Sequence, residues 1–522
     1  MTTSGIDSSA DATATIFDLL GNGANDAPAI GAPKRASLDF EGLKSLAETT
    51  VTALNERGLG SGDRVAIVLP NGPEMAASFV AIACGCSAAP LNPAYRKEEF
   101  DFYLSDLNAK ALIVDAGSTS PALEVARERN IPVLELNSLA CRPAGSFTLS
   151  GETGTAAKLT GRTTAGDEAL VLHTSGTTSR PKIVPLSQAN INASARHIRE
   201  ILKLTADDRC LNVMPLFHIH GLIAATLSSL GAGGSVHCVP GFNALRFFTW
   251  MEQCRPTWYT AVPTMHQAIL TRADRNRETI EKVPLRLVRS SSASLPPQVM
   301  AELEEVFSAP VIESYGMTEA AHQMASNPLP PRPRKPGTVG IAAGPDLGVM
   351  DETGILLEAG EVGEIVIRGP NVTQGYESNP KANAEAFTNG WFRTGDQGRF
   401  DNEGYLTITG RLKEVINRGG EKISPREVDE VLLDHPAVAQ AVTFAIPHDK
   451  LGEEVCAAVV LSNSQTATAN ELRDFVGERL ADFKVPRKVL ILDEIPKGAT
   501  GKVQRIGLAK KLGLIQDAET AR

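Results

Sequence analysis

Strand-like and helix-like segments alternate through the first half of the chain, and this alternation constrains the fold more than any other feature. An apolar run at residues 64–69 is followed by a helical pattern at residues 73–84 and by a second apolar run at residues 111–115. Buried parallel strands joined by crossover helices produce this order. The sequence therefore predicts an α/β fold built on parallel sheets.

The second half of the chain changes character, and the total length of 522 residues exceeds what one hydrophobic core usually organises. Short strands and turns fill residues 363–410, and residues 401–404 have the Asp-Asn-Glu-Gly composition of a hairpin turn. We therefore predict a large N-terminal domain, residues 1–410, in which stacked α/β sheets are joined to a small β-rich module.

A separate small α+β domain is predicted for residues 411–522. Ser424, Pro425 and Glu427 have the spacing of a capping box with proline in the first helical position, which predicts a helix from Pro425 to Leu433. Two strand-like runs and a further helical pattern follow it along the chain.

Charge and cysteine content restrict the partners of the chain. The net charge is −10, whereas a nucleic-acid surface needs a basic footprint to neutralise phosphates. No stretch approaches the roughly eighteen apolar residues of a membrane helix. The seven cysteines lack the paired spacing of a zinc site, so they read as reduced, mostly buried thiols. We predict a cytoplasmic protein, monomeric or weakly homo-oligomeric, that binds neither nucleic acid nor membrane.

A hydroxyl-rich loop directly follows the apolar run that ends at His173. It combines hydroxyl side chains and a flexible glycine with the cations Arg180 and Lys182, which supply the donors and the positive charge that a triphosphate needs. The spacing G-x-x-x-x-G-K-[ST] of a P-loop is absent. On composition alone, a phosphate-binding loop and an ordinary polar surface loop are equal alternatives.

This loop resembles the signature of the acyl-adenylate-forming superfamily, which contains acyl-CoA synthetases, luciferases and peptide-synthetase adenylation domains. Further segments that are similar to the superfamily's motifs follow in the expected order, at residues 215–221, 313–319, 391–396, 410–414 and 496–505. The resemblance implies an enzyme that activates a carboxylic acid with ATP and passes the acyl group to coenzyme A, with Mg²⁺ as the metal.

The resemblance also implies which residues contact ATP and the metal. The phosphates meet the loop residues Thr174, Ser175, Gly176, Thr177, Thr178 and Lys182. The adenine segment is Glu313, Ser314, Tyr315 and Gly316. Asp396 offers paired acceptors to the ribose hydroxyls, and Arg411 donates to phosphate or ribose oxygens. Glu319 and Thr178 are the implied magnesium ligands, because a hard cation prefers oxygen.

Lys502 carries the implied catalysis of the first step, because an ammonium can bridge the attacking carboxylate and the α-phosphate. The remaining members of the implied catalytic set are Thr318, Glu319 and His218. The resemblance further implies that the small domain rotates about a hinge near Lys413 after adenylation. Arg418, Gly419 and Gly420 then line the pantetheine channel, although a glycine turn with solvated charges is an alternative.

The segments that form the acid pocket in this superfamily are unusually polar in this chain. These segments contribute His218 and His220, residues 289–294, and His322, and the side chains expected to receive the acid are His218, Ser290, Ser292 and His322. A fatty-acid or cinnamate pocket needs small and apolar residues, whereas hydroxyls and imidazoles suit the second carboxylate of a short diacid. Within the superfamily, the oxalate-CoA ligases are the group that the chain resembles most, on residues 172–182, 257–264 and 417–425.

Four alternatives stay open at this point. The acid could be another small or aromatic carboxylate, or the acyl acceptor could be a carrier protein instead of coenzyme A. A light-emitting oxygenase shares the scaffold but demands an apolar pocket. A non-catalytic nucleotide sensor is disfavoured because Lys502, Glu319 and Asp396 are all retained.

Overall fold

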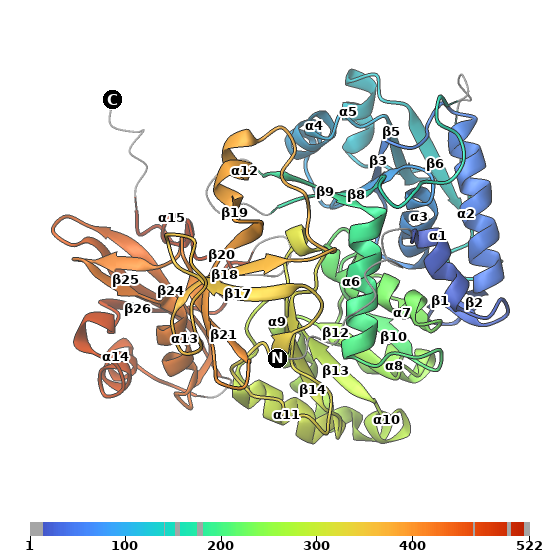
Figure 1. Cartoon of the computed structure of the whole chain (residues 1–522). Helices are drawn as coiled ribbons and strands as arrows, with labels where there is room; N and C mark the ends of the chain where they lie inside the picture. Colours follow the sequence, from blue (N-terminus) through green and yellow to red (C-terminus); the bar gives the residue numbers. More distant parts are fainter. Residues whose placement is uncertain are drawn as a thin grey trace. The chain divides into compact units, whose positions relative to one another are not determined.

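The computed structural model describes residues 14–139, 141–151, 157–174, 181–462, 465–497 and 503–515 (Figure 1). The chain forms two compact units. The first contains the described residues of 1–174, 181–347 and 367–390, and the second contains those of 348–366 and 391–522.

A nine-stranded sheet is the larger of two sheets in the first unit, with the order β16-β15-β14-β13-β12-β10-β11-β1-β2. The strands from β14 to β1 in this order are parallel, and the edge strands β2, β15 and β16 are antiparallel. The bounds are β1 Pro28–Ala32, β2 Arg35–Asp39, β10 Arg209–Asn212, β11 Ser235–Cys238, β12 Trp258–Ala261, β13 Leu287–Ser290, β14 Val311–Tyr315, β15 Ala325–Ser326 and β16 Ile341–Ala342.

A seven-stranded sheet has the order β7-β6-β5-β3-β4-β8-β9, again with a parallel centre and antiparallel edges β7 and β9. Its strands are β3 Arg64–Val68, β4 Ser87–Pro90, β5 Ala111–Asp115, β6 Val133–Ser138, β7 Phe147–Ser150, β8 Glu168–His173 and β9 Ile183–Ser187. The predicted alternation of buried strands and crossover helices is confirmed by β3, α3 (Pro73–Ala83) and β5.

Helices cover both sheets. The helix α3 contacts β4 of the seven-stranded sheet and β1 and β11 of the nine-stranded sheet. Every residue of α3 except Glu74 is buried, as expected of a helix that is apolar on all sides. The other helices near this layer are α1 Ile16–Leu19, η2 Leu20–Asn22, α2 Phe40–Asn55, α6 Gln188–Ile201, the π-helix η3 His220–Leu227 and α7 Ser228–Gly231.

Two further helix groups pack on the outer faces of the sheets (Figure 1). The helices α4 Lys97–Asp106 and α5 Ala122–Glu128 pack on the seven-stranded sheet through Phe100, Leu104 and Val125. The nine-stranded sheet is covered by α8 Phe247–Cys254, α9 Pro263–Leu270, η4 Ala273–Asn276, α10 Arg277–Lys282 and α11 Pro297–Phe307. The short elements η5 Thr318–Ala320, α12 Pro380–Ala386 and β19 Phe387–Thr388 complete the first unit.

The second unit contains the C-terminal α+β region and those parts of the predicted β-rich region that lie outside residues 367–390. In the β-rich region, β17, β18 and β20 lie in that order, and β21 pairs with β20 across a hairpin in which Asp401 N donates to Tyr405 O. The bounds are β17 Asp346–Met350, β18 Gly363–Arg368, β20 Trp391–Phe400 and β21 Leu406–Arg411. The turn predicted at residues 401–404 is therefore confirmed.

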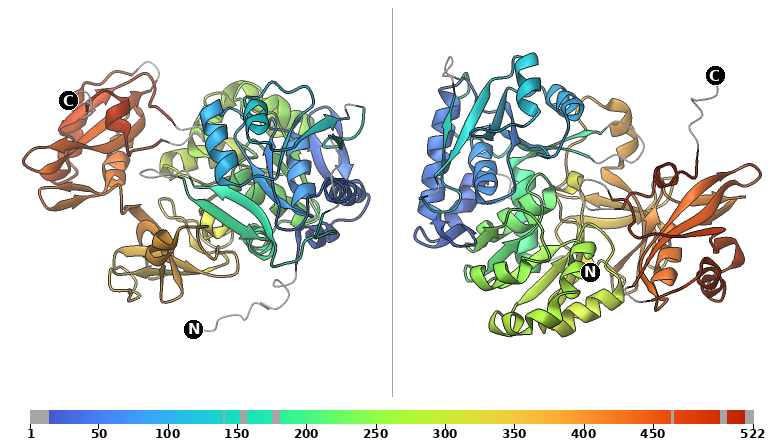
Figure 2. Two further views of the ribbon diagram at one scale, coloured as in Figure 1. Left: turned by 90° about the horizontal axis from the view of Figure 1, so that it is seen from above. Right: turned by 180° about the vertical axis from the view of Figure 1, so that it is seen from behind.

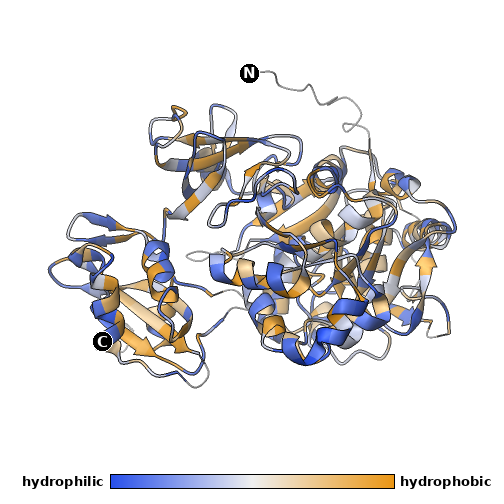
Figure 3. Cartoon of the chain, turned by 90° about the horizontal axis from the view of Figure 1, so that it is seen from below, coloured by the Kyte–Doolittle hydropathy of each residue, from blue (hydrophilic) through white to orange (hydrophobic). Residues whose placement is uncertain are grey.

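The C-terminal sheet has the order β23-β22-β25-β24, with β26 beside β25. Its strands are β22 Ile416–Arg418, β23 Glu421–Ile423, β24 Val438–His448, β25 Gly452–Leu461 and β26 Lys488–Ile491. The helices α13 Pro425–Leu433 and α14 Ala469–Gly477, the turn η6 Asp482–Lys484 and α15 Leu508–Lys511 accompany it, in the orange to red part of the chain in Figure 2. Figure 3 shows the apolar strands of this sheet beside the polar outer sides of its helices.

The capping box predicted at the start of α13 is wrong, although the helix has the predicted bounds. The Ser424 hydroxyl makes no hydrogen bond to the helix and donates instead to the Thr409 carbonyl of β21. Glu427 pairs with Lys484 at 2.7 Å. Two tertiary contacts thus replace the local capping that the spacing suggested.

Within the described ranges, no helix is long and apolar enough to cross a membrane. All seven cysteines are free, and six of them are buried while Cys141 is exposed. The prediction that the thiols are mostly buried is therefore confirmed.

Candidate active site

The predicted site residues of the nine-stranded sheet lie where its parallel strands end. Ser290 is the last residue of β13, Tyr315 is the last residue of β14, and His218 follows β10. Parallel strands end at one edge of a sheet, so these segments meet. Ser291 Oγ donates to the Ser314 carbonyl at 3.0 Å, and Ser314 Oγ donates to the Ser290 carbonyl at 3.3 Å.

Glu319, the implied metal ligand, is buried in the turn η5 and held in place by Tyr376. The Tyr376 hydroxyl donates to Glu319 Oε1 at 2.8 Å, and the Lys182 Nζ lies 4.2 Å from the centroid of the Tyr376 ring. Burial, and then the negative charge of Glu319, raise the pKa of Tyr376, so its hydroxyl stays a donor. Tyr376 was not predicted, because it lies 57 residues from Glu319 in sequence.

The chemistry of this carboxylate fits a hard divalent cation. Magnesium is usually bound by one or two carboxylates together with substrate phosphates, not by a cage of protein ligands. No group of three or more His, Cys, Asp or Glu side chains in the described part of the chain could hold a metal ion. Glu319 therefore suits a site that the substrate phosphates complete.

Glu313, predicted in the adenine segment, is buried inside the protein. Its Oε1 accepts a hydrogen bond from Leu295 N at 2.9 Å, which ties β14 to the segment after β13. Gly316 packs directly on His322, since a Cβ at position 316 would lie 1.5 Å from the His322 carbonyl oxygen. Only glycine fits there, and the half-buried Thr318 begins η5 two residues later.

The residues predicted for the acid pocket gather around two imidazoles. The rings of His220 and His322 meet edge to face with centroids 4.9 Å apart, and both residues are only 2% exposed. His220 Nδ1 lies 3.1 Å from Ser292 Oγ, and His220 Nε2 lies 2.6 Å from Thr260 Oγ1. His218 and Ser292 are half-buried, so these two predicted residues are the accessible ones.

Arg289, the first residue of the polar segment 289–294 that was expected at the pocket, lies behind these residues. It is fully buried, and its guanidinium donates to Gln323 Oε1 at 3.1 Å and to Thr260 Oγ1 at 3.4 Å. Burial lowers the pKa of Arg289 to about 9. The available sequence signal was a cation directly after the apolar pair Leu287 and Val288 in the same strand. The predicted pocket residue Ser290 is also fully buried.

Several pocket residues have a left-handed backbone that is unfavourable for residues other than glycine. The φ angles are +74° at Ser292, +47° at Ala321 and +96° at His322. The π-helix η3, which starts at His220, is another unusual backbone feature, and such helices often occur at functional sites. The surrounding structure therefore holds these side chains in place against a local conformational cost.

Part of the predicted machinery lies outside the described residues. This part comprises Ser175, Gly176, Thr177 and Thr178 of the loop, together with Lys502, the residue predicted to be catalytic. The residues that flank the loop are described: Thr174 N donates to the Lys182 carbonyl at 2.9 Å, and Lys182 N donates to Thr174 Oγ1 at 3.2 Å.

The second unit joins the two residues predicted at the ribose. Arg411 Nε donates to Asp396 Oδ1 at 2.9 Å, and the two residues are opposite each other in the β20–β21 pair. Asp396 is 5% exposed, whereas the Arg411 side chain is 52% exposed. Glu364 supports the segment, because its carboxylate accepts from Arg393 Nε at 2.6 Å and from Gly395 N at 2.8 Å.

The predicted hinge residue Lys413 lies on the next connection, and the residues predicted at coenzyme A lie on the hairpin that follows it. Lys413 is exposed between β21 and β22. Gly419 and Gly420 form the two-residue turn between β22 and β23, with φ of +61° and +99°. Two successive positive φ angles are what such a hairpin turn needs, and glycine supplies them without strain. Arg418 pairs with the buried Glu454.

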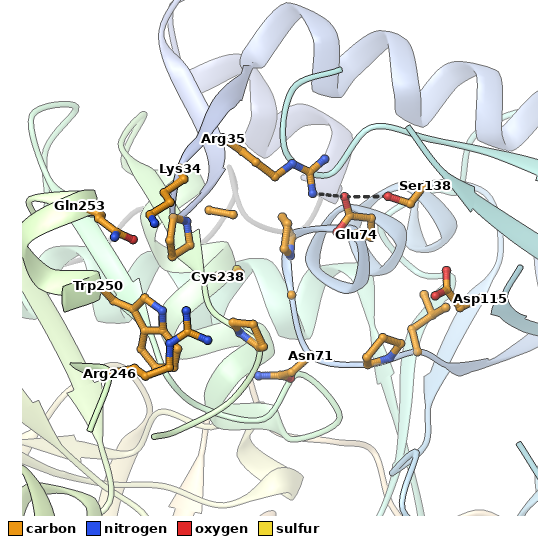
Figure 4. Close-up of a pocket in the computed structure, with 17 residues that line it drawn as sticks. Lys34, Arg35, Asn71, Glu74, Asp115, Ser138, Cys238, Arg246, Trp250 and Gln253 are labelled. Atoms are coloured by element: carbon orange, nitrogen blue, oxygen red, sulfur yellow. Dashed lines mark hydrogen bonds and ion pairs between the residues drawn. The ribbon is translucent and has the colours of Figure 1, made fainter. Parts of the chain in front are cut away.

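A cavity of about 360 Å³ in the first unit was not predicted from the sequence (Figure 4). It lies at the carboxyl ends of β3 and β5, and its lining includes Lys34, Arg246 and Trp250. Asn71, also in the lining, accepts from Leu216 N at 2.7 Å. None of the predicted site residues lines this cavity. The acid pocket and the cavity are therefore built from different side chains.

Comparisons with known proteins were made for sequence and for structure. Residues 17–377 match the AMP-binding enzyme family, and residues 427–502 match the AMP-binding enzyme C-terminal domain. The chain is 46% identical over 503 residues to the oxalate–CoA ligase of Arabidopsis thaliana, and this alignment covers 94% of the chain and 97% of that protein. It is 43% identical over 474 residues to the oxalate–CoA ligase of Saccharomyces cerevisiae, covering 86% of each.

Among solved structures, ATP-bound MatB from Rhodopseudomonas palustris has a TM-score of 0.86 and 30% sequence identity. The superposition covers 96% of this chain and 99% of that protein. The similarity extends over both units, so the resemblance noted from the ordered motifs holds for nearly the whole chain.

Proposed function

The chain belongs to the AMP-binding enzyme family, and on that premise we propose that it is an ATP-dependent ligase that converts oxalate to oxalyl-CoA. Its relatives named oxalate–CoA ligase, at 46% and 43% identity, support this proposal. The observation that carries it is the acid pocket, where two buried imidazoles, the Ser292 hydroxyl and a buried cation replace the apolar lining that a hydrophobic acid needs.

The reaction has two steps. In the first, a carboxylate oxygen of oxalate attacks the α-phosphorus of ATP, so that a new P–O bond forms and pyrophosphate leaves. In the second, the sulfur of coenzyme A attacks the activated carbonyl carbon, so that a C–S bond forms and AMP leaves. No general base is needed in the first step, because the carboxylate is already ionised at neutral pH.

The residues of the first unit bind the acid and orient the phosphates. His218, Ser290, Ser292 and His322 receive the acid, and Thr174, Lys182 and Thr318 serve the phosphates. Glu319 would supply the carboxylate ligand of a bound Mg²⁺, with Thr178 as a second ligand, and the ion would neutralise phosphate charge. Tyr376 keeps the Glu319 carboxylate in one orientation. The segment from Glu313 to Gly316 binds the adenine.

The residues of the second unit serve ribose, catalysis and thiol transfer. Asp396 binds the ribose hydroxyls and Arg411 supplies donors beside it. Lys502 stabilises charge in the adenylation step. We place the domain boundary between residues 410 and 411, so that a rotation about Lys413 withdraws Lys502 and brings the turn with Arg418, Gly419 and Gly420 to the pantetheine arm.

The enzyme acts in the cytoplasm as a monomer or weak homo-oligomer in this proposal. Its partners are a small carboxylate, ATP and coenzyme A. The seven free cysteines support a reducing compartment. A ligase for another small or aromatic acid is the second candidate function, and a transfer to a carrier protein is the third.

Pyrophosphate exchange with a panel of acids tests the proposal. The purified protein is given ATP, Mg²⁺ and labelled pyrophosphate with oxalate, malonate, glyoxylate, acetate or a cinnamate. We expect exchange to be fastest with oxalate, and we expect oxalyl-CoA to form when coenzyme A is added. Exchange with a monocarboxylate but not with oxalate would overturn the assignment of the acid. Adenylation without a CoA thioester would favour a carrier protein.

A further inference from the structure

Arg289 has a cationic side chain in a place where a cation is costly. It is fully buried on β13, and its neighbour across the sheet is Thr260 of β12. Within the described ranges, no aspartate or glutamate forms an ion pair with it, and its polar contacts are to His220, Thr260 and Gln323. A buried charge normally requires a partner of opposite sign. A ligand that brings negative charge to this pocket would provide one.

The guanidinium also determines which nitrogen of His220 carries the proton. Arginine can only donate hydrogen bonds, and its Nη1 lies 3.4 Å from His220 Nε2. A proton on Nε2 would face this cation, so Nε2 accepts and the neutral ring carries its proton on Nδ1. The Thr260 hydroxyl fits the same arrangement, because it can accept from Arg289 and donate to Nε2 at 2.6 Å.

This tautomer orders the hydroxyl of Ser292. With its proton on Nδ1, His220 donates to Ser292 Oγ at 3.1 Å. The Ser292 oxygen then accepts, and its own proton can be donated elsewhere. Ser292 is half-buried and held at a φ of +74°, which fixes its side chain at the accessible end of this chain of contacts. Arg289, His220 and Ser292 thus form a polarised line from the sheet to the pocket.

We infer that Arg289 is the positioning residue for the distal carboxylate of the acid: through His220 it makes Ser292 a hydrogen-bond donor to that carboxylate, and its charge compensates the second negative charge. Because this arrangement provides a donor and a compensating positive charge for a second carboxylate, it favours a short dianion as the acid. The inference rests on the proposed function and deepens it. Ser290 Oγ and Gln323 Nε2, two more buried groups without a hydrogen-bond partner in the described part of the chain, are additional donors of the same layer.

A purely structural role for Arg289 makes a different prediction. An arginine that only fills the space beneath the sheet would affect all acids equally when it is replaced. A residue that positions the donor to a distal carboxylate would affect only acids that have one. Oxalate and glyoxylate are a matched pair for this comparison, because the second group is a charged carboxylate in oxalate and an uncharged aldehyde, hydrated in water, in glyoxylate.

The test compares Arg289→Gln, Arg289→Lys and Ser292→Ala by pyrophosphate exchange with each acid. We expect Arg289→Gln to raise the KM for oxalate on the order of 10²-fold, with little change in the KM for ATP or for glyoxylate. Arg289→Lys retains the charge and should recover most of the oxalate affinity. Ser292→Ala should show the same selective loss. Arg246→Gln, which removes an exposed cation outside the site, is the matched control and should behave as the wild type.

The outcomes separate the inference from the proposed function. If the wild type exchanges with oxalate but Arg289→Gln affects oxalate and glyoxylate equally, the positioning role is refuted and the ligase assignment stands. If the wild type shows no exchange with oxalate, the assignment of the acid fails first. Should Arg289→Gln not fold, Ser292→Ala decides the matter, because an unchanged preference for oxalate in that variant also refutes the positioning role.

Discussion

The hydrogen bond between Tyr376 and Glu319 gives the sharpest prediction about the metal site. Replacing Tyr376 by phenylalanine removes only the hydroxyl that donates to Glu319 Oε1 at 2.8 Å. The aromatic ring beneath the Lys182 ammonium, 4.2 Å away, is retained. The substitution therefore isolates the orientation of one carboxylate from the packing around it.

The expected magnitude follows from the burial of both groups. Tyr376 is 7% exposed and Glu319 is 6% exposed, so water replaces the lost donor poorly. A hydrogen bond to a charged group contributes about 1.5–3 kcal/mol. Loss of a residue that orients a metal ligand typically weakens metal binding by about 10- to 100-fold, which corresponds to about 1.4–2.8 kcal/mol. The free-energy range for the lost hydrogen bond therefore agrees with the range for weakened metal binding.

The assay is a Mg²⁺ titration of oxalate-dependent pyrophosphate exchange, together with a denaturant unfolding curve. We expect Tyr376→Phe to raise the Mg²⁺ concentration for half-maximal exchange by about 10- to 100-fold while the KM for oxalate stays unchanged. Tyr259→Phe is the control, because its hydroxyl also lies in a buried contact, 3.1 Å from His266 Nδ1. It should lose stability without shifting the Mg²⁺ curve. Wild-type Mg²⁺ dependence in Tyr376→Phe would refute the assignment of Glu319 as the metal ligand.

Three further predictions concern catalysis, acid recognition and pH. Lys502→Ala should abolish adenylation but leave CoA thioester formation from supplied acyl-adenylate largely intact, and equal loss of both steps would contradict the domain rotation. His322→Ala should raise the KM for oxalate at least about 10-fold with an unchanged KM for ATP, since it removes a pocket imidazole; unchanged acid kinetics would make it structural. Burial lowers the pKa of His197 and His237 to about 4 and that of His266 to about 3. These three histidines stay neutral in the folded state, but they become protonated in the unfolded state below about pH 6.5. Acidification from pH 7.5 to 5.5 should therefore lower the free energy of unfolding, measured by denaturant titration, by about 4 kcal/mol. A denaturation midpoint that does not change with pH would contradict their burial in the neutral form.

The order of elements and motifs could be predicted from the sequence because it depends on short-range patterns. Apolar runs and helical periodicity located β3, α3 and β5, and the Asp-Asn-Glu-Gly turn located the hairpin at residues 401–404. Parallel strands that follow one another in the sheet end at the same edge, so the contact between Ser290 and Ser314 could also be predicted from the order of the strands. Each of these features depends on residues a few positions apart.

Ser424 shows where such reasoning fails. Its spacing to Glu427 satisfies the local rule for a capping box, yet its hydroxyl donates to the Thr409 carbonyl. The side chain had two acceptable partners, and the packing of α13 near β21 selected the distant one. A local pattern can name a partner only when no tertiary partner competes with it.

The sequence by itself determined which kinds of residue meet at the site, and the tertiary structure decided how they work together. His218, Ser292 and His322 were predicted from their motifs. Tyr376 as the partner of Glu319, and Arg289 as the partner of His220, depend on contacts across 57 and 69 residues of sequence. Arg289 is buried only because the sheets and helices pack around it, and this burial is what makes its positive charge unfavourable in free energy without a negative partner.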